Sequence, residues 1–206
     1  MNEIAFISLR ERRRLATAAE VSAAALELFE EQGVAATTIA EIARAAGISD
    51  RTFFRYFSSK EETVLDFQHW FDAPTRAWLE SGPSPENLLD QLEEVCATVL
   101  RQLDGPLSED ADRLRRIRSL MKNETSLRAV SAMLDGEQAS ALADRIVRSF
   151  DGRVSPVEAR LIAEIVGVGL RTACENWSAR RDAGEQATLE GSYRLVREAL
   201  VSLTSH

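Results

Sequence analysis

The sequence predicts an all-α fold, and three observations support this class. Nearly every periodic segment places apolar residues three or four positions apart, which is the spacing of one helix face. Alternation of apolar and polar residues with β-branched enrichment, which would indicate strands, is absent over any useful length. Serine or threonine caps precede several of these segments, and glycine or proline follows them, so we expect about nine helices.

Composition narrows the class of protein further. A chain of 206 residues with 45% hydrophobic residues can bury a sizeable core, which argues against intrinsic disorder. The sequence contains no long uncharged apolar run and does not begin like a signal peptide, so we expect a soluble, cytoplasmic protein and no membrane partner. Cys96 and Cys174 lie far apart in predicted helix interiors, which argues against a disulfide framework or a thiolate metal site.

The net charge of −8 is unevenly distributed along the chain. Residues 1–60 contain equal numbers of basic and acidic residues, so the whole excess of negative charge lies in residues 61–206. Such a chain does not bind nucleic acid over its entire surface. A basic surface confined to one face of the N-terminal module would still suit specific DNA binding.

The first predicted helix runs from about Leu15 to Gly33. Two stripes of apolar or small residues, at positions 15, 19, 22, 26 and 29 and at positions 18, 21, 25 and 28, give it a broad face to bury. A basic run precedes it, formed by Arg10, Arg12, Arg13 and Arg14. This run suits DNA phosphates or the neighbouring minor groove, although a solvated helix start explains it equally well.

Two short helices are predicted next. Thr38 and Glu41 have the spacing of a capping box, and Gly47 ends the helix that follows them. Ser49 or Asp50 caps a very short third helix. Its inward residues are Phe53, Tyr56 and Phe57, and its outward residues are Asp50, Arg51, Thr52, Phe54 and Arg55. Two short helices joined by a glycine turn are typical of a helix-turn-helix.

The middle of the chain contains further helix starts and stops. Ser59 opens a helix with Val64, Phe67, Phe71 and Trp78 on one side, and Pro74 predicts a kink or break near residues 72–73. Residues 82–85 form a linker in which Ser84 caps the next helix and Pro85 enters its first turn. The remaining helices of this region are expected at residues 85–103, 108–121 and 125–150.

The two C-terminal helices have apolar residues in two directions. Ser155, Pro156 and Glu158 form a strong helix start, and the last helix carries Leu189 and Tyr193. Because one face packs on the chain's own core, the second face needs another partner, and a second copy of the chain is the economical choice. The residues expected at this dimer interface are Leu161, Ile165, Val168, Val196 and Leu200. Gly167 and Gly169 fit a close helix approach.

The segment TTIAEIARAAGISDRTFFRYFSSKEETV, beginning at Thr37, closely resembles the DNA-binding signature of the TetR family of regulators. The resemblance extends back to about residue 15, and beyond residue 65 it is one of architecture only. It implies an N-terminal three-helix DNA-binding domain at residues 1–58 and a helical ligand-binding and dimerisation domain at residues 59–206. It also implies a homodimer, most often a repressor, that binds a palindromic operator in double-stranded DNA and is released by a small apolar or amphipathic effector.

The residues expected to bind DNA follow from the signature and from the chemistry of base edges. A recognition helix presents its N-terminal residues to the major groove, and these are Ser49, Asp50, Arg51, Thr52 and Arg55. One of the two arginines would contact guanine and the other a phosphate. The resemblance places Thr38, Tyr56 and Lys60 at positions that clamp the DNA backbone, and Thr38 is also a plain helix cap. Phe54 departs from the family pattern, which usually has tyrosine there, so an apolar contact to sugar or to a thymine methyl would replace a phosphate hydrogen bond.

The effector-binding residues are less well defined by the sequence. Larger apolar and aromatic residues of the second domain could line a cavity, although most residues at this spacing simply belong to a core. The candidates are Phe67, Phe71, Trp78, Met121, Met133 and Trp177. The TFFRYF segment and residues 116–133 resemble a subset of the family associated with acyl-CoA-like effectors. His69 has no partner at ligand spacing, so we expect no metal and no cofactor.

The alternatives to a regulator are an enzyme and a helical ligand-binding or scaffold protein. An enzyme would need a nucleophile with a base, paired carboxylates in a pocket or a phosphate-binding loop, and the sequence shows none of these. A helical ligand-binding or scaffold protein could retain a helix-turn-helix without operator specificity. The outward arginines and threonine of residues 49–55 favour DNA binding over a scaffold.

Overall fold

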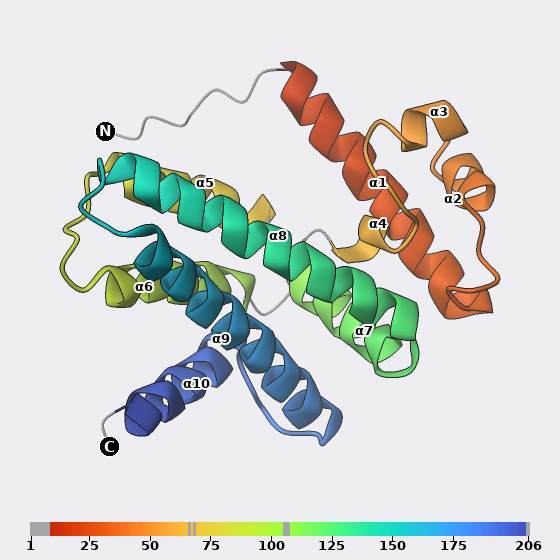
Figure 1. Ribbon diagram of the computed structural model, residues 1–206. Coiled ribbons are helices and arrows are strands. Elements are labelled where there is room, and N and C mark those ends of the chain that lie inside the picture. The colour runs from red at the N-terminus through yellow and green to blue at the C-terminus, as the bar shows by residue number, and fades with distance from the viewer. Residues whose placement is uncertain (1–8, 66, 68, 105–107, 205–206) are drawn as a thin grey trace. The chain divides into compact units, whose positions relative to one another are not determined.

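The computed structural model describes residues 9–65, 67, 69–104 and 108–204, and within these ranges every regular element is a helix (Figure 1). The helices are α1 (Leu9–Gln32), α2 (Ile39–Ala45), α3 (Asp50–Phe53), α4 (Glu62–Leu65), α5 (His69–Glu80), α6 (Leu88–Leu103), α7 (Glu109–Asn123), α8 (Thr125–Ser149), α9 (Pro156–Asp182) and α10 (Leu189–Thr204). The all-α prediction is confirmed. Ten helices replace the expected nine because the helix predicted from Ser59 is divided into α4 and α5.

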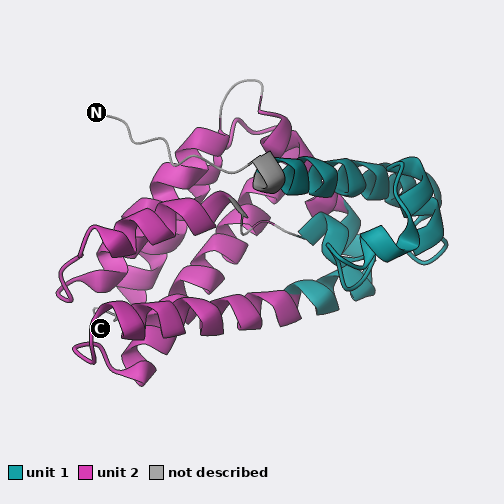
Figure 2. Ribbon diagram, turned by 90° about the horizontal axis from the view of Figure 1, so that it is seen from above, with its two compact units in different colours: residues 1–66, 120–131 teal, residues 67–119, 132–206 magenta. Residues whose placement is uncertain are grey.

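The helices form two compact units, coloured separately in Figure 2. Unit 1 comprises Met1–Asp66 together with Leu120–Ser131, and unit 2 comprises Phe67–Ser119 together with Ala132–His206. Unit 1 therefore extends past the boundary expected at residue 58. The cause is that α4 packs on α1, where the buried Ser22 hydroxyl donates to the carbonyl of Thr63.

Unit 1 is organised around one face of α1. This face begins at Val21 and continues through Leu26 and Phe29, whereas Leu15 at the start of the predicted stripe is exposed. Ile42 of α2, Phe53 of α3 and Val64 of α4 supply further buried apolar side chains of the same unit. Burial of these residues fixes the two short helices α2 and α3, which are too short to be stable alone.

Of the kink or break predicted near residues 72–73, the break does not occur. Helix α5 runs without interruption from His69 to Glu80 with Pro74 inside it, and α4 ends earlier, at Leu65. Proline removes one hydrogen bond of the helix. The helix nevertheless continues, because Phe71 and Trp78 pack against the core of unit 2 and Asp72 forms an ion pair with Arg145 of α8 at 3.5 Å.

The start predicted for the next helix is also displaced. Helix α6 begins at Leu88 and not at Pro85, and its cap residue Asn87 has a left-handed backbone without a side-chain cap. The side-chain amide of Gln91 instead donates to the carbonyls of Ser84 at 3.0 Å and Glu86 at 2.8 Å. A side chain from the first turn therefore satisfies the carbonyls of the linker.

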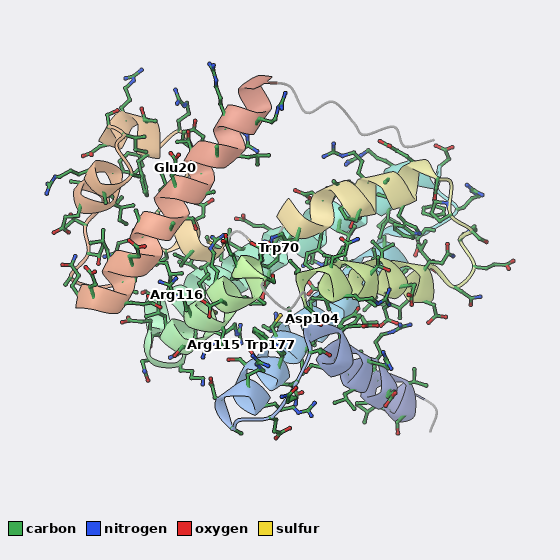
Figure 3. All side chains as sticks on the ribbon, turned by 180° about the vertical axis from the view of Figure 1, so that it is seen from behind. Glu20, Trp70, Asp104, Arg115, Arg116 and Trp177 are labelled. Carbon is green, nitrogen blue, oxygen red and sulfur yellow. The ribbon has the colours of Figure 1, made fainter. Side chains whose placement is uncertain are left out.

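Helices α6, α9 and α10 pack together in unit 2. Asp104, at the end of α6, lies beside the start of α10 (Figure 3), where its carboxylate accepts hydrogen bonds from the backbone N–H groups of Leu189 and Glu190 at 2.8 and 2.9 Å. Arg197 of α10 donates to the buried carboxylate of Glu93 on α6 at 2.8 Å. These contacts fix α10 against α6.

Cys96 lies in the core of unit 2, and its burial raises the pKa of its thiol to about 12.

Within the described ranges, no helix combines the length and apolar character needed to cross a membrane. The same residues contain no group of three or more histidine, cysteine or acidic side chains placed to hold a metal ion.

Candidate functional site

The helix-turn-helix has the predicted local geometry. The Thr38 hydroxyl accepts a hydrogen bond from the Glu41 N–H at 3.2 Å, while the Glu41 carboxylate accepts from the Thr38 N–H at 2.8 Å. This reciprocal capping box begins α2 as expected. Gly47 adopts a φ of +67°, which L-residues rarely tolerate, and so allows the tight turn between α2 and α3.

The capping box also affects the titration of its carboxyl group. The hydrogen bonds from the side chain and backbone of Thr38 lower the pKa of Glu41, and the charge of Arg44 acts in the same direction. The carboxylate therefore remains ionised at neutral pH, where it is the better acceptor. Because Thr38 is exposed, a DNA phosphate could approach this cap from outside.

Helix α3 is held by its own cap and by its aromatic residues. The Ser49 hydroxyl accepts from the Thr52 N–H at 3.2 Å and lies 3.0 Å from the Thr52 hydroxyl. Phe53 is fully buried, and its ring packs at 5.8 Å from that of the buried Phe57. Two inward anchors thus set which residues face outward.

The outward surface of α3 carries the residues expected to contact bases. Asp50, Arg51, Phe54 and Arg55 are exposed, and Thr52 is half-buried. Arg51 lies on α3 and Arg55 in the turn directly after it, so both guanidinium groups can reach the same groove. This exposed surface, formed by residues 49–52, 54 and 55, is called the α3 surface below.

Tyr56 differs from its predicted inward position, since it is half-buried. The guanidinium carbon of Arg55 lies 5.1 Å from the centre of the Tyr56 ring, and an N–H of Arg55 donates to the Tyr56 hydroxyl at 3.4 Å. The phenol therefore supports Arg55 from one side. Tyr56 remains a candidate phosphate contact through the same hydroxyl.

Lys60 occupies a structural position that the sequence did not indicate. Its ammonium group donates to the carbonyls of Val34 at 2.6 Å and Thr37 at 2.7 Å, with Ala35 at 3.5 Å. These carbonyls lie between α1 and α2. An ammonium has three donors, so a phosphate contact by Lys60 would compete with the bonds that hold this loop.

A second surface lies on α9 and α10. The stripe of α9 that contains Ile162, Val166 and Trp177 is buried in unit 2, whereas Leu161 and Val168 on the other stripe are 57% and 42% exposed. Ile165, Val196 and Leu200 are half-buried. Further exposed apolar side chains on these helices are Val157, Leu195, Val201 and Leu203. We call the exposed residues of this set, with Ile165, the α9–α10 face.

The two glycines of α9 have different surroundings. A Cβ atom at Gly169 would lie 3.3 Å from the ring of Tyr193 on α10, so this glycine serves the packing of the chain's own helices. A Cβ atom at Gly167 would meet nothing within 4 Å. Only Gly167 thus remains free for the close approach expected from a second copy.

The expected effector-binding residues do not all lie together. Phe67, Phe71 and Trp78 pack against the core of unit 2, and Trp177 is part of that core. Met121 is buried but belongs to unit 1, and Met133 on α8 is exposed. The structure thus places only the four aromatic candidates in or against the core of unit 2.

Both the N-terminal segment and most of the chain match known proteins. The model of the family described as bacterial regulatory proteins, tetR family, matches residues 21–66. The HTH-type transcriptional regulator TcmR of Streptomyces glaucescens is 31% identical over 183 residues, which cover 87% of this chain and 80% of TcmR. The chain belongs to the TetR family. As a TetR-family protein it is a DNA-binding transcriptional regulator, and its relative TcmR is named as a regulator and not as an enzyme.

Solved structures share the fold of this TetR-family chain. One of them is NalD of Pseudomonas aeruginosa, the secondary repressor of a multidrug efflux pump. Its TM-score is 0.53 at 18% sequence identity, and the aligned region covers 93% of this chain and 96% of the NalD chain. Another is FadR of Thermus thermophilus, a repressor solved in complex with lauroyl-CoA. Its TM-score is 0.50 at 22% sequence identity, and the aligned region covers 89% of this chain and 93% of the FadR chain. Because both sequence identities are low, the similarity to these two structures shows a shared fold only.

The structure of this TetR-family protein reveals a structural role for Thr37 that the sequence did not indicate, and a polar property of Trp78, which the sequence named only as a large apolar candidate. Thr37 is buried and its hydroxyl donates to the Gly33 carbonyl at 2.9 Å, which fixes the connection between α1 and α2. The indole N–H of Trp78 is buried and has no hydrogen-bond partner among the described residues. The spacing to Glu41 marks Thr38 as the helix cap, but no sequence signal indicates that its neighbour Thr37 is buried.

Proposed function

We propose that this TetR-family regulator is a homodimeric repressor that binds a palindromic operator through the α3 surface of each protomer and releases it when an amphipathic effector binds unit 2. The observation that carries this proposal is the α3 surface itself. Two exposed arginines lie four positions apart, Arg51 on α3 and Arg55 in the turn that follows it, and the inward residues of this segment are locked in a core. Arginine can bond to guanine O6 and N7 at once, which gives sequence selectivity.

The roles of the individual residues follow from their surroundings. Arg55 makes a cation–π contact with Tyr56, whereas Arg51 makes none with the residues that the structure describes, so we assign Arg51 to a base and Arg55 to a phosphate. Thr38, Ser49 and Thr52 offer hydroxyls to the DNA backbone from two helix caps. We assign Lys60 first to the structural role of holding the loop between α1 and α2, and only second to a contact with a DNA phosphate.

The α9–α10 face supports the dimer. Six of the nine large apolar side chains that are exposed in the described chain lie on these two helices. Apolar residues gathered on adjacent helices are covered in stable proteins, and a two-fold pair of identical faces is the most common solution. Dimerisation would give the two recognition helices the separation of successive major grooves, roughly 34 Å.

The interior of unit 2 supports an amphipathic effector. Phe67, Phe71 and Trp78 pack around its core, and Trp78 presents a buried N–H donor without an acceptor. Such a donor is costly when unpaired, so a ligand oxygen would stabilise it. An effector with an apolar chain and a polar acceptor group fits both features, and lauroyl-CoA, the ligand of the Thermus thermophilus FadR structure, is the first candidate to test.

Coupling between the two units has a physical route. Helices α7 and α8 each contribute residues to both units, because the division falls at residues 119–120 and 131–132. A rigid helix that moves at one end also moves at the other. We propose that effector binding shifts these helices and changes the spacing of the recognition helices, which lowers operator affinity without unfolding.

A footprint tests the proposal. Purified protein is incubated with DNA flanking its own coding sequence, and protection of a palindromic site that lauroyl-CoA or another amphipath abolishes is the expected result. Arg51→Ala should weaken binding by about 1–3 kcal/mol and relax selectivity at one base pair. Arg76→Ala, which removes an exposed arginine of α5, is the matched control. Binding without sequence preference by the unaltered protein would refute an operator-specific function.

A further inference from the structure

The α3 surface contains one side chain that does not fit a polar DNA-binding surface. Phe54 is 58% exposed, and it is the only exposed aromatic residue among those that the structure describes. Its neighbours in sequence with the same side chain, Phe53 and Phe57, are both buried. The core of unit 1 is therefore complete without Phe54.

The ring of Phe54 is held in place by its surroundings. It packs edge-to-face on the buried ring of Phe53, with 5.6 Å between centroids and 83° between planes. Its backbone is helical, and its N–H donates to the Asp50 carbonyl at 3.0 Å. Because both the ring and its backbone are fixed, Phe54 presents a preorganised apolar surface that loses little conformational entropy when it binds a partner.

The neighbours of Phe54 indicate what that partner is. Six of the eight other exposed large apolar residues lie on α9 and α10, whereas Phe54 belongs to the α3 surface together with Arg51, Thr52 and Arg55. A phenyl ring cannot hydrogen-bond a phosphate or a base edge. The major groove exposes one apolar group for direct contact, the C5-methyl of thymine.

We propose that Phe54 is a specificity-determining residue that contacts the C5-methyl group of a thymine in each operator half-site. The inference rests on the proposed function, since it requires α3 to enter the major groove. It adds an apolar contact beside the polar contacts of Arg51 and Thr52. Each operator half-site would therefore carry a preferred thymine near the base pair that Arg51 contacts.

The experiment replaces single thymines of the footprinted operator by deoxyuridine, which removes the methyl group and leaves base pairing intact. Burial of one methyl-sized group is worth about 0.8 kcal/mol, so the substitution should weaken binding by roughly fourfold in one half-site. Substitution in both half-sites should weaken binding by roughly 15-fold. The readout is the dissociation constant from fluorescence anisotropy at fixed salt concentration.

A double-mutant cycle assigns the methyl contact to Phe54. Phe54→Ala should bind the thymine and deoxyuridine operators equally, because the ring that distinguishes them is gone. Thr52→Ser removes the other methyl group on this part of the surface and keeps its hydroxyl, so sensitivity to deoxyuridine should persist in that variant. Circular dichroism checks that Phe54→Ala folds, which the exposure of the side chain leads us to expect.

Three outcomes are informative. Loss of discrimination in Phe54→Ala alone supports the proposal. Equal binding of thymine and deoxyuridine operators by the unaltered protein overturns it and leaves the proposed function intact, since operator binding is measured in the same experiment. Discrimination that persists in Phe54→Ala and disappears in Thr52→Ser assigns the methyl contact to Thr52 and also overturns it.

Discussion

Replacing Leu161 and Val168 by glutamate should dissociate the dimer. Complete burial of such a side chain contributes about 1.5–3 kcal/mol relative to full exposure. Leu161 is 57% and Val168 42% exposed in the protomer, so about half of this, roughly 1 kcal/mol for each side chain, remains to be gained at an interface. A two-fold interface contains each residue twice, which gives about 4 kcal/mol or roughly a 1,000-fold change in the dissociation constant.

Sedimentation equilibrium over a range of concentrations measures this change. The unaltered protein is expected as a dimer and the double variant as a monomer with unchanged helix content. Leu15→Glu, which places the same charge on an exposed apolar position of unit 1, is the control and should remain dimeric. A double variant whose dissociation constant stays within tenfold of the original would refute the assignment of the α9–α10 face.

Three further predictions concern contacts inside each unit. Asp104→Ala should destabilise unit 2 by about 1 kcal/mol in thermal denaturation, since it removes the acceptor for two N–H groups at the start of α10, and an unchanged midpoint would contradict this role. Gly169→Ala places a methyl group 3.3 Å from the Tyr193 ring and should lower the urea midpoint, because an overpacking cost of about 1–3 kcal/mol exceeds the gain in helix propensity. Gly167→Ala, with open space, is its control and should not lower the midpoint. Glu41→Gln should reduce stability at neutral pH, because the folded-state pKa of Glu41 is lowered. That contribution is complete above the ordinary value of 4.5 and is lost as the pH falls through the lowered pKa, so the two proteins should become equally stable in strong acid.

Local signals in the sequence predicted the helix-turn-helix well. The capping boxes and caps of α2, α3 and α9 formed where Thr38, Ser49 and Ser155 predicted them. Gly47 adopts the positive φ that its place after α2 required. Each of these features depends on hydrogen bonds between residues three or four positions apart, so a short stretch of sequence contains all the groups involved.

The predictions that the structure contradicts concern positions whose structure depends on contacts with residues far away in the sequence. Pro74 predicted a kink or break, yet α5 is not broken there, because Phe71 and Trp78 pack on the core of unit 2 on either side of it. Gly169 was assigned to contact with a second copy and instead packs against Tyr193 of its own chain. Both positions have a strong local preference that tertiary contacts outweigh.

The sequence by itself determined the all-α class, the helix-turn-helix and the outward residues of α3, because periodicity and caps are local properties of the chain, and it indicated the family through the resemblance of the signature that begins at Thr37. Tertiary structure alone decided that Lys60 holds the loop before α2 and that Asp104 caps a helix 85 residues away. These contacts join groups far apart in sequence, so they exist only once the helices have packed and each side chain has either found a buried partner or been left on the surface.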